Sequence, residues 1–70
     1  MTFTFETYED KDVLIEISQE KFENTYRVKG YKNHGGQYGF PFTETIYPTK
    51  EKAKRRFNYL RNKAKKGELL

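Results

Sequence analysis

From Thr49 to Gly67 the chain reads TKEKAKRRFNYLRNKAKKG. Between Lys50 and Lys66 this stretch contains no glycine, no proline and no β-branched residue, which are the residues that lower helix propensity. Apolar residues recur there at spacings of 4, 3 and 4, the period of one helix face: Ala53, Phe57, Leu60 and Ala64. Thr49 suits the N-cap, and Gly67 is a common residue just beyond a C-terminus. The stretch therefore predicts a helix over Lys50–Lys66.

The residues before this helix alternate between apolar and polar, which is the period of half-buried strands. We expect the second strand to direct Val13, Ile15 and Ile17 toward the core. Glycine and asparagine in residues 33–36 predict a turn, because both tolerate positive φ. Pro41 cannot donate to a ladder, so the last strand is an edge, is bulged or begins after it. The predicted strands are 2–8, 13–18, 25–31 and 38–47, with a loop over 19–24.

These elements predict an α+β fold of the order β-β-β-β-α, with a small antiparallel sheet of three to four strands. The single helix is expected to pack on one face of that sheet. Six Phe and six Tyr among only 70 residues favour a sheet, since aromatic rings supply large buried areas. The predicted core comprises Phe3, Phe5, Val13, Ile15, Ile17, Tyr26, Val28, Phe42, Ile46, Ala53, Phe57 and Leu60.

Length and composition narrow the class of protein. Seventy residues predict a single domain over 1–70, divided into a sheet region at 1–48 and a basic helix at 49–67. The chain has no cysteine, so it has no disulfide, and this fits a reducing cytoplasm. The N-terminal residues lack the pattern of a signal peptide, and no apolar run is long enough to span a membrane. We therefore expect a cytoplasmic protein.

The charges are divided unevenly along the chain. Residues 1–48 carry five basic and eight acidic side chains, a net charge of −3, whereas residues 49–70 carry nine basic and two acidic ones, a net charge of +7. Like charges packed on one helix repel each other at i,i+4 spacing. A polyanion offsets this repulsion, because neutralising phosphates releases counterions. The asymmetry thus favours a nucleic acid as partner.

On a helical wheel, most of the cations fall on the half opposite the apolar stripe, with Tyr59 near the middle of that half. Arginine binds guanine or phosphate bidentately, asparagine reads adenine, and tyrosine stacks on a base or contacts a phosphate. We predict a nucleic-acid-binding surface in which Arg55, Tyr59 and Asn62 lie centrally. Its flanking backbone contacts are Lys52, Arg56, Lys63 and Lys66. The alternative is a solvated helix whose lysines only aid solubility.

The third strand offers a second basic and aromatic set. Arg27, Lys29 and Tyr31 alternate onto one face of it, and such a set can contact a groove or stack single-stranded bases. The same residues are also ordinary on the wet face of a sheet that is covered on one side only.

Catalysis is not expected. The chain has one histidine and no HExxH pattern, Gly-rich phosphate loop or GxSxG elbow, so we predict no metal site, no cofactor and no small-molecule substrate. The predicted function is a small non-catalytic nucleic-acid-binding module, with DNA slightly favoured over RNA. The alternative is an interaction or accessory domain that docks an acidic protein partner. We expect no membrane association and either a monomer or a weak homodimer that pairs through an edge strand.

Overall fold

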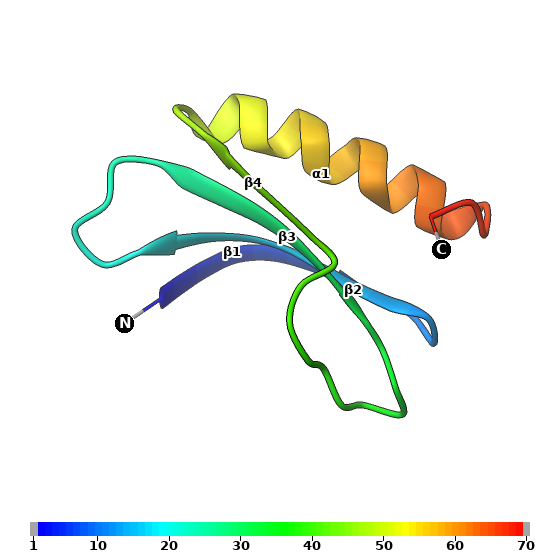
Figure 1. Cartoon of the computed structure of the whole chain (residues 1–70). Coiled ribbons are helices and arrows are strands. Elements are labelled where there is room, and N and C mark those ends of the chain that lie inside the picture. Colours follow the sequence, from blue (N-terminus) through cyan, green and yellow to red (C-terminus); the bar gives the residue numbers. More distant parts are fainter. Residues whose placement is uncertain (1, 70) are drawn as a thin grey trace.

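The computed structural model describes residues 2–69 and confirms the predicted α+β class. Four antiparallel strands form one open sheet, and a single C-terminal helix packs on one of its faces (Figure 1). The strands follow one another in chain order across the sheet, so that β1 and β4 are its edges. The elements are β1 (Thr2–Glu9), β2 (Val13–Glu20), β3 (Tyr26–Lys32), β4 (Thr43–Tyr47) and α1 (Lys50–Lys65).

Helix α1 begins where the sequence predicts and ends one residue earlier than predicted. The Thr49 hydroxyl accepts a hydrogen bond from the Lys52 backbone N–H at 3.2 Å, which satisfies one of the free donors of the first turn. Gly67 has a φ of 71° and its N–H donates to the Ala64 carbonyl at 3.0 Å, which closes the helix. Lys66, predicted as the last helical residue, is the C-cap instead.

The core lies between α1 and the sheet and is centred on Phe57, whose side chain is fully buried. The helix packs over β2, β3 and β4. Seven of the predicted core residues are confirmed as buried: Val13, Ile15, Ile17, Val28, Ala53, Phe57 and Leu60. Tyr26 is half-buried and packs against them.

The prediction was wrong for the core residues of β4. Ile46 stands opposite Arg27 on the face of the sheet that carries no helix, and it is 51% exposed. Its neighbour Tyr47, opposite Tyr26, packs against the core instead. The strand is shorter than predicted because residues 38–42, around Pro41, belong to the loop after β3. Phe42 therefore lies outside the strand and is exposed, although its N–H donates to the Gly30 carbonyl at 2.8 Å.

Phe3 and Phe5 of β1 were also wrongly placed in the core. The pairing of β1 with β2 shifts between Thr4 and Glu6, so Phe5 is the extra residue of a β-bulge. Phe3 stands opposite Gln19, which shares its face with Ile17, so Phe3 lies on the helix side of the sheet. Both rings are nevertheless exposed, since α1 lies over β2 to β4 and leaves this edge of the sheet uncovered.

Asp10 organises the turn between β1 and β2. One of its carboxylate oxygens accepts the backbone N–H groups of Asp12 and Val13 at 2.8 and 2.9 Å, and the other accepts the Tyr8 hydroxyl at 2.9 Å. Burial alone would raise the pKa of Asp10, but these hydrogen bonds favour the carboxylate and hold that pKa below its usual value. The same Asp10 hydrogen bond is the main cause of the raised pKa of Tyr8.

Truncation of the central ring tests the packing of α1 on the sheet. We expect Phe57→Ala to lower the free energy of unfolding by about 3–5 kcal/mol, because a fully buried ring leaves a cavity. Urea denaturation followed by circular dichroism measures the change. Phe40→Ala is the matched control, since Phe40 is 97% exposed and its loss should change stability by less than about 0.5 kcal/mol. Equal effects of the two substitutions would contradict this packing.

The turn at Asp10 should make stability depend on pH. Asp10→Ala is expected to cost about 1–2 kcal/mol near neutral pH, because three hydrogen bonds to the carboxylate are lost. A lowered folded-state pKa adds stability above the unfolded pKa of about 3.9, and that stability is lost as pH falls through the folded pKa. Thermal melts from pH 7 down to pH 2 should therefore converge for the two proteins. Asp12→Ala, whose carboxylate makes none of these bonds, is the control.

Candidate functional site

The helix presents a continuous exposed stripe on the side away from the sheet. Its members recur at spacings of 3, 4, 3 and 4, and all five are exposed: Lys52, Arg55, Tyr59, Asn62 and Lys66. This stripe mirrors the buried one that docks on the sheet, as expected for an amphipathic helix. From Lys52 to Lys66 it runs about 21 Å at 1.5 Å per residue. The structure thus brings the central residues of the predicted site together with two of its predicted flanking lysines.

Tyr59 lies between two cations on the stripe. The Arg56 guanidinium is 5.1 Å from the centre of the Tyr59 ring, and the Lys63 ammonium is 5.7 Å from it. Both distances are within the range of cation–π attraction. Tyr59 itself is 50% exposed, so its ring sits in a cationic setting that is open to solvent.

Few of the helix cations are neutralised. In residues 2–69, ion pairs involving helix cations join Lys54 to Glu6, Arg55 to Glu51 and Lys63 to Glu68. The Arg55–Glu51 pair spans 3.5 Å between side chains that are 77% and 81% exposed, so it is weak and easily exchanged. Within the same residues the other basic side chains of this segment form no ion pair: Lys50, Lys52, Arg56, Arg61, Lys65 and Lys66.

A second flank of the helix faces β1, and the sequence assigned no role to it. Lys54 forms an ion pair with Glu6, and the Lys50 ammonium lies 4.7 Å from the centre of the Phe5 ring. Toward the other end of the helix, the Lys65 ammonium lies 5.9 Å from the centre of the Tyr8 ring. On a helical wheel these lysines fall at the side of the helix, between its buried and its fully exposed faces. Which strand they meet depends on tertiary packing, so sequence could not supply it.

The predicted sheet residues Arg27, Lys29 and Tyr31 are not part of this surface. They alternate with the buried Val28 and Gly30, and they pair across β2 with Ser18, Glu16 and Leu14 on the face that carries no helix. The sheet therefore lies between them and α1.

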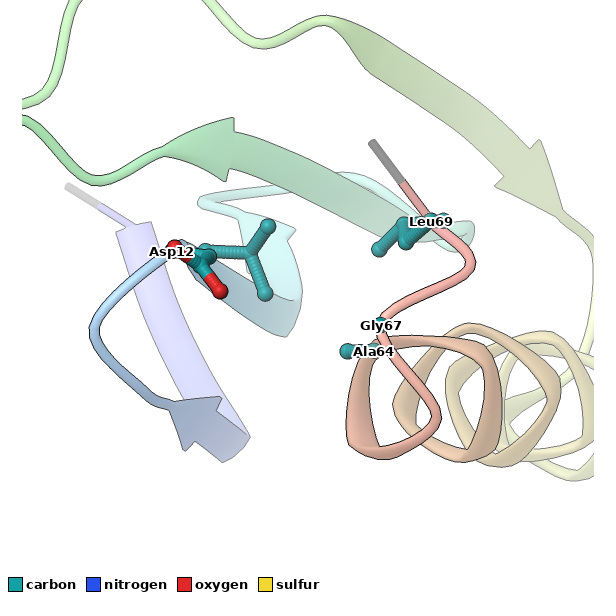
Figure 2. A pocket seen from close by; sticks show the side chains of 5 residues that line it. Asp12, Ala64, Gly67 and Leu69 are labelled. Carbon is teal, nitrogen blue, oxygen red and sulfur yellow. The ribbon is translucent and has the colours of Figure 1, made fainter.

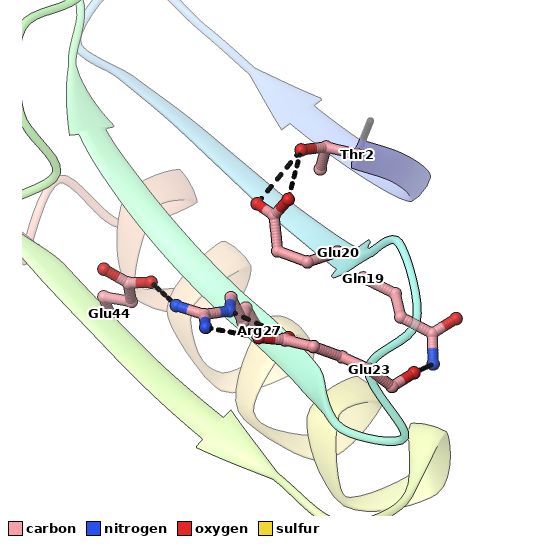
Figure 3. Close-up of polar contacts among 6 residues, drawn as sticks. All are labelled: Thr2, Gln19, Glu20, Glu23, Arg27 and Glu44. Carbon is pink, nitrogen blue, oxygen red and sulfur yellow. Dashed lines mark hydrogen bonds and ion pairs between the residues drawn. The ribbon is translucent and has the colours of Figure 1, made fainter.

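Arg27 is held by two carboxylates. Its guanidinium donates to Glu23 and to Glu44, each at 2.8 Å (Figure 3). The Glu23 hydrogen bond is the main cause that raises the pKa of Arg27, and the Arg27 hydrogen bond in turn lowers the pKa of Glu23. A phosphate would have to displace these two partners in order to reach Arg27.

The surroundings of Lys29 and Tyr31 are acidic as well. Lys29 stands opposite Glu16 on one side and Glu44 on the other. The Tyr31 hydroxyl points to Glu16 at 3.5 Å, and burial followed by this carboxylate raises the Tyr31 pKa. This face of the sheet thus combines its cations with nearby carboxylates, in contrast to the helix stripe.

A recess of about 240 Å³ lies where the end of α1 meets the start of β2. Asp12, Ala64, Gly67 and Leu69 line it together with Val13 (Figure 2). Leu69 and Ala64 pack against the core there, so the recess is the end of the seam between helix and sheet. It is smaller than the 300–1,000 Å³ typical of ligand pockets.

Residues 2–69 contain no group of three or more His, Cys, Asp or Glu side chains placed to hold a metal ion. The one helix in this range is too short and too polar to cross a membrane.

No family model, curated protein or solved structure matches this chain. Its function is therefore inferred from the surface described above.

Proposed function

We propose that this domain is a non-catalytic nucleic-acid-binding module that contacts duplex DNA, ahead of RNA, through the exposed stripe of α1. The observation that carries the proposal is the stripe itself. Lys52, Arg55 and Lys66 are exposed along one side of the helix, and within residues 2–69 the only acid that forms an ion pair with any of them is the solvent-exposed Glu51. Release of counterions by such side chains is the main source of affinity for a phosphate backbone.

The dimensions of the stripe suit a duplex. An α-helix with its side chains is about 10–12 Å across, and the major groove of B-DNA is about 12 Å wide. Within that width Arg55 and Asn62 would face base edges, while Lys52 and Lys66, at either end of the stripe, would contact phosphates. Tyr59, flanked by Arg56 and Lys63, would add a phenol hydrogen bond to the backbone.

The distribution of acids supports the same orientation. On the helix-free face of the sheet Glu16, Glu20 and Glu44 stand among the strands, and Arg27 is paired with carboxylates. A polyanion would be repelled there and attracted by α1 on the other side.

Charge removal on the stripe tests this proposal. In fluorescence anisotropy with a random-sequence duplex, the wild type should bind with a steep salt slope of about −0.9 per phosphate contacted. Arg55→Gln with Lys66→Gln should reduce the slope by about two and weaken binding at low salt by about tenfold or more.

The control removes the same charge from the sheet. Arg27→Gln with Lys29→Gln should leave the slope and affinity nearly unchanged, because both residues lie on the face of the sheet that carries no helix. Equal losses for the two double variants would show that only net charge matters. Absence of any binding at low salt would instead favour the second candidate, an acidic protein partner docked on the same stripe.

A further inference from the structure

The start of β1, the start of α1 and the turn between β2 and β3 lie at the same end of the molecule (Figure 1). Phe3 and Phe5 come from β1, and Phe22 comes from the turn between β2 and β3. That turn leaves the sheet beside the start of β1, since Thr2 pairs with Glu20. We name this surface the aromatic end; its members are Phe3, Phe5, Phe22, Lys21 and Lys50.

The three phenylalanines are poorly covered. Phe3 is 52% exposed, Phe5 41% and Phe22 93%. Single exposed apolar residues are common, but three exposed rings near one end of a 70-residue chain offer a partner a large aromatic contact area. None of the three rings belongs to the buried core, although the Phe5 ring lies 5.6 Å, centre to centre, from the ring of Tyr26, which packs against that core.

Each side of the patch carries a cation close to a ring. The Lys50 ammonium is 4.7 Å from the centre of the Phe5 ring, and the Lys21 ammonium is 5.0 Å from the centre of the Phe22 ring. Burial of these rings in an apolar protein interface would also desolvate the two ammonium groups, which is costly, and lysine is depleted at interface cores. A partner with flat apolar faces joined by anionic groups could stack on the rings and pair with the ammonium groups at the same time.

Phe22 adds a backbone observation. Its φ of 71° lies in the left-handed region, which is unfavourable for a residue with a Cβ. Glycine would adopt this conformation freely, and the Phe22 side chain gains no burial that compensates for the strain. Strained residues of this kind occur at functional sites, where the side chain is needed in that position.

We propose that the aromatic end is a second binding site, at which the unpaired bases of a single-stranded nucleic acid stack. Bases stack on aromatic side chains whatever their sequence, while nearby cations contact the phosphates. Lys54, the next lysine along this flank of α1, already neutralises Glu6, the acid nearest to Phe5 in β1. The Tyr8 hydroxyl already donates to Asp10, so we place the end of the site before that residue.

A second copy of the chain is the competing occupant, because β1 is an edge strand. The bulge at Phe5 disrupts the regular spacing that edge-to-edge pairing needs. Sedimentation of the free protein and of its aromatic variants decides between the two occupants.

The first test compares single strands with a duplex. Anisotropy is measured with an oligothymidine of about twelve nucleotides, with the matching RNA and with a duplex. Phe3→Ala with Phe5→Ala should weaken single-strand binding by about tenfold or more, since two of the rings on which bases would stack are removed. Duplex binding should change by less than about twofold, because these residues lie outside the stripe. The DNA and RNA arms show which sugar is preferred.

Matched controls separate this site from the helix stripe. Phe40→Ala removes a ring that is 97% exposed, in the loop after β3, and should leave both affinities unchanged. Unchanged single-strand binding in the Phe3, Phe5 variant would overturn the second site while leaving the duplex proposal intact. Single-strand binding that needs these rings but survives loss of Arg55 and Lys66 would support the site even if duplex binding fails. A dimer that dissociates in the Phe3, Phe5 variant would assign the surface to a second copy instead.

A direct stacking signal is available because the chain has no tryptophan. Phe3→Trp introduces a single indole, and stacking of a base on it should quench its fluorescence on addition of oligothymidine. Phe40→Trp, in the loop after β3, is the matched control and should not respond. An unquenched Phe3→Trp protein under conditions in which the strand is bound would overturn the proposal.

Phe22→Gly separates a structural from a binding role. Relief of the positive φ should raise the Tm by about 4–8 °C, while loss of the ring should weaken single-strand binding by about fivefold or more. Higher stability with weaker binding supports the site. Higher stability with unchanged affinity would remove Phe22 from it.

Discussion

Burial of Phe57 between α1 and the sheet is the interaction on which the rest of this structure depends. The helix has only a narrow apolar stripe, and Phe57, with Ala53 and Leu60, fills it. One helix with a stripe of this width covers β2, β3 and β4 and reaches β1 mainly through the lysines of its flank. The exposure of the β1 phenylalanines and the position of the basic flank of α1 both follow from this limited coverage.

The elements could be predicted from the sequence because their signals are local. Alternation in β2, the cap at Thr49 and the glycine after the helix depend only on neighbouring residues, and the structure confirms them. For the edge strands β1 and β4, the sequence did not predict which side chains point toward the core. The bulge at Phe5 and the late start of β4 each change which residues face the core. The alternation of apolar and polar residues in the sequence shows neither of them. Gln19 and Glu20, expected in a loop, extend β2 because β1 pairs with them.

The candidate site, too, could be predicted where it depends on local sequence and not where it depends on strand pairing. The stripe from Lys52 to Lys66 follows from 3.6 residues per turn, so its exposed members could be chosen from the sequence alone. The acidic environment of Arg27 could not be predicted from the sequence, because Glu44 comes close to Arg27 only when β3 pairs with β4. Proximity of charges that are distant in the chain depends on register, and register depends on how the whole sheet pairs.

The charges are distributed unequally between the two sides of the molecule, so that one side is acidic and the other basic. Carboxylates stand among the strands on the helix-free face, whereas the cations of α1 project on the other side of the sheet or toward β1. A polyanion approaching from solution is therefore oriented before contact, at distances up to the Debye length of about 8 Å in physiological salt. Because the aromatic end begins where α1 begins, a nucleic acid steered to the helix arrives next to exposed rings. An acidic protein would be steered in the same way, but it would lack the bases that could stack on those rings.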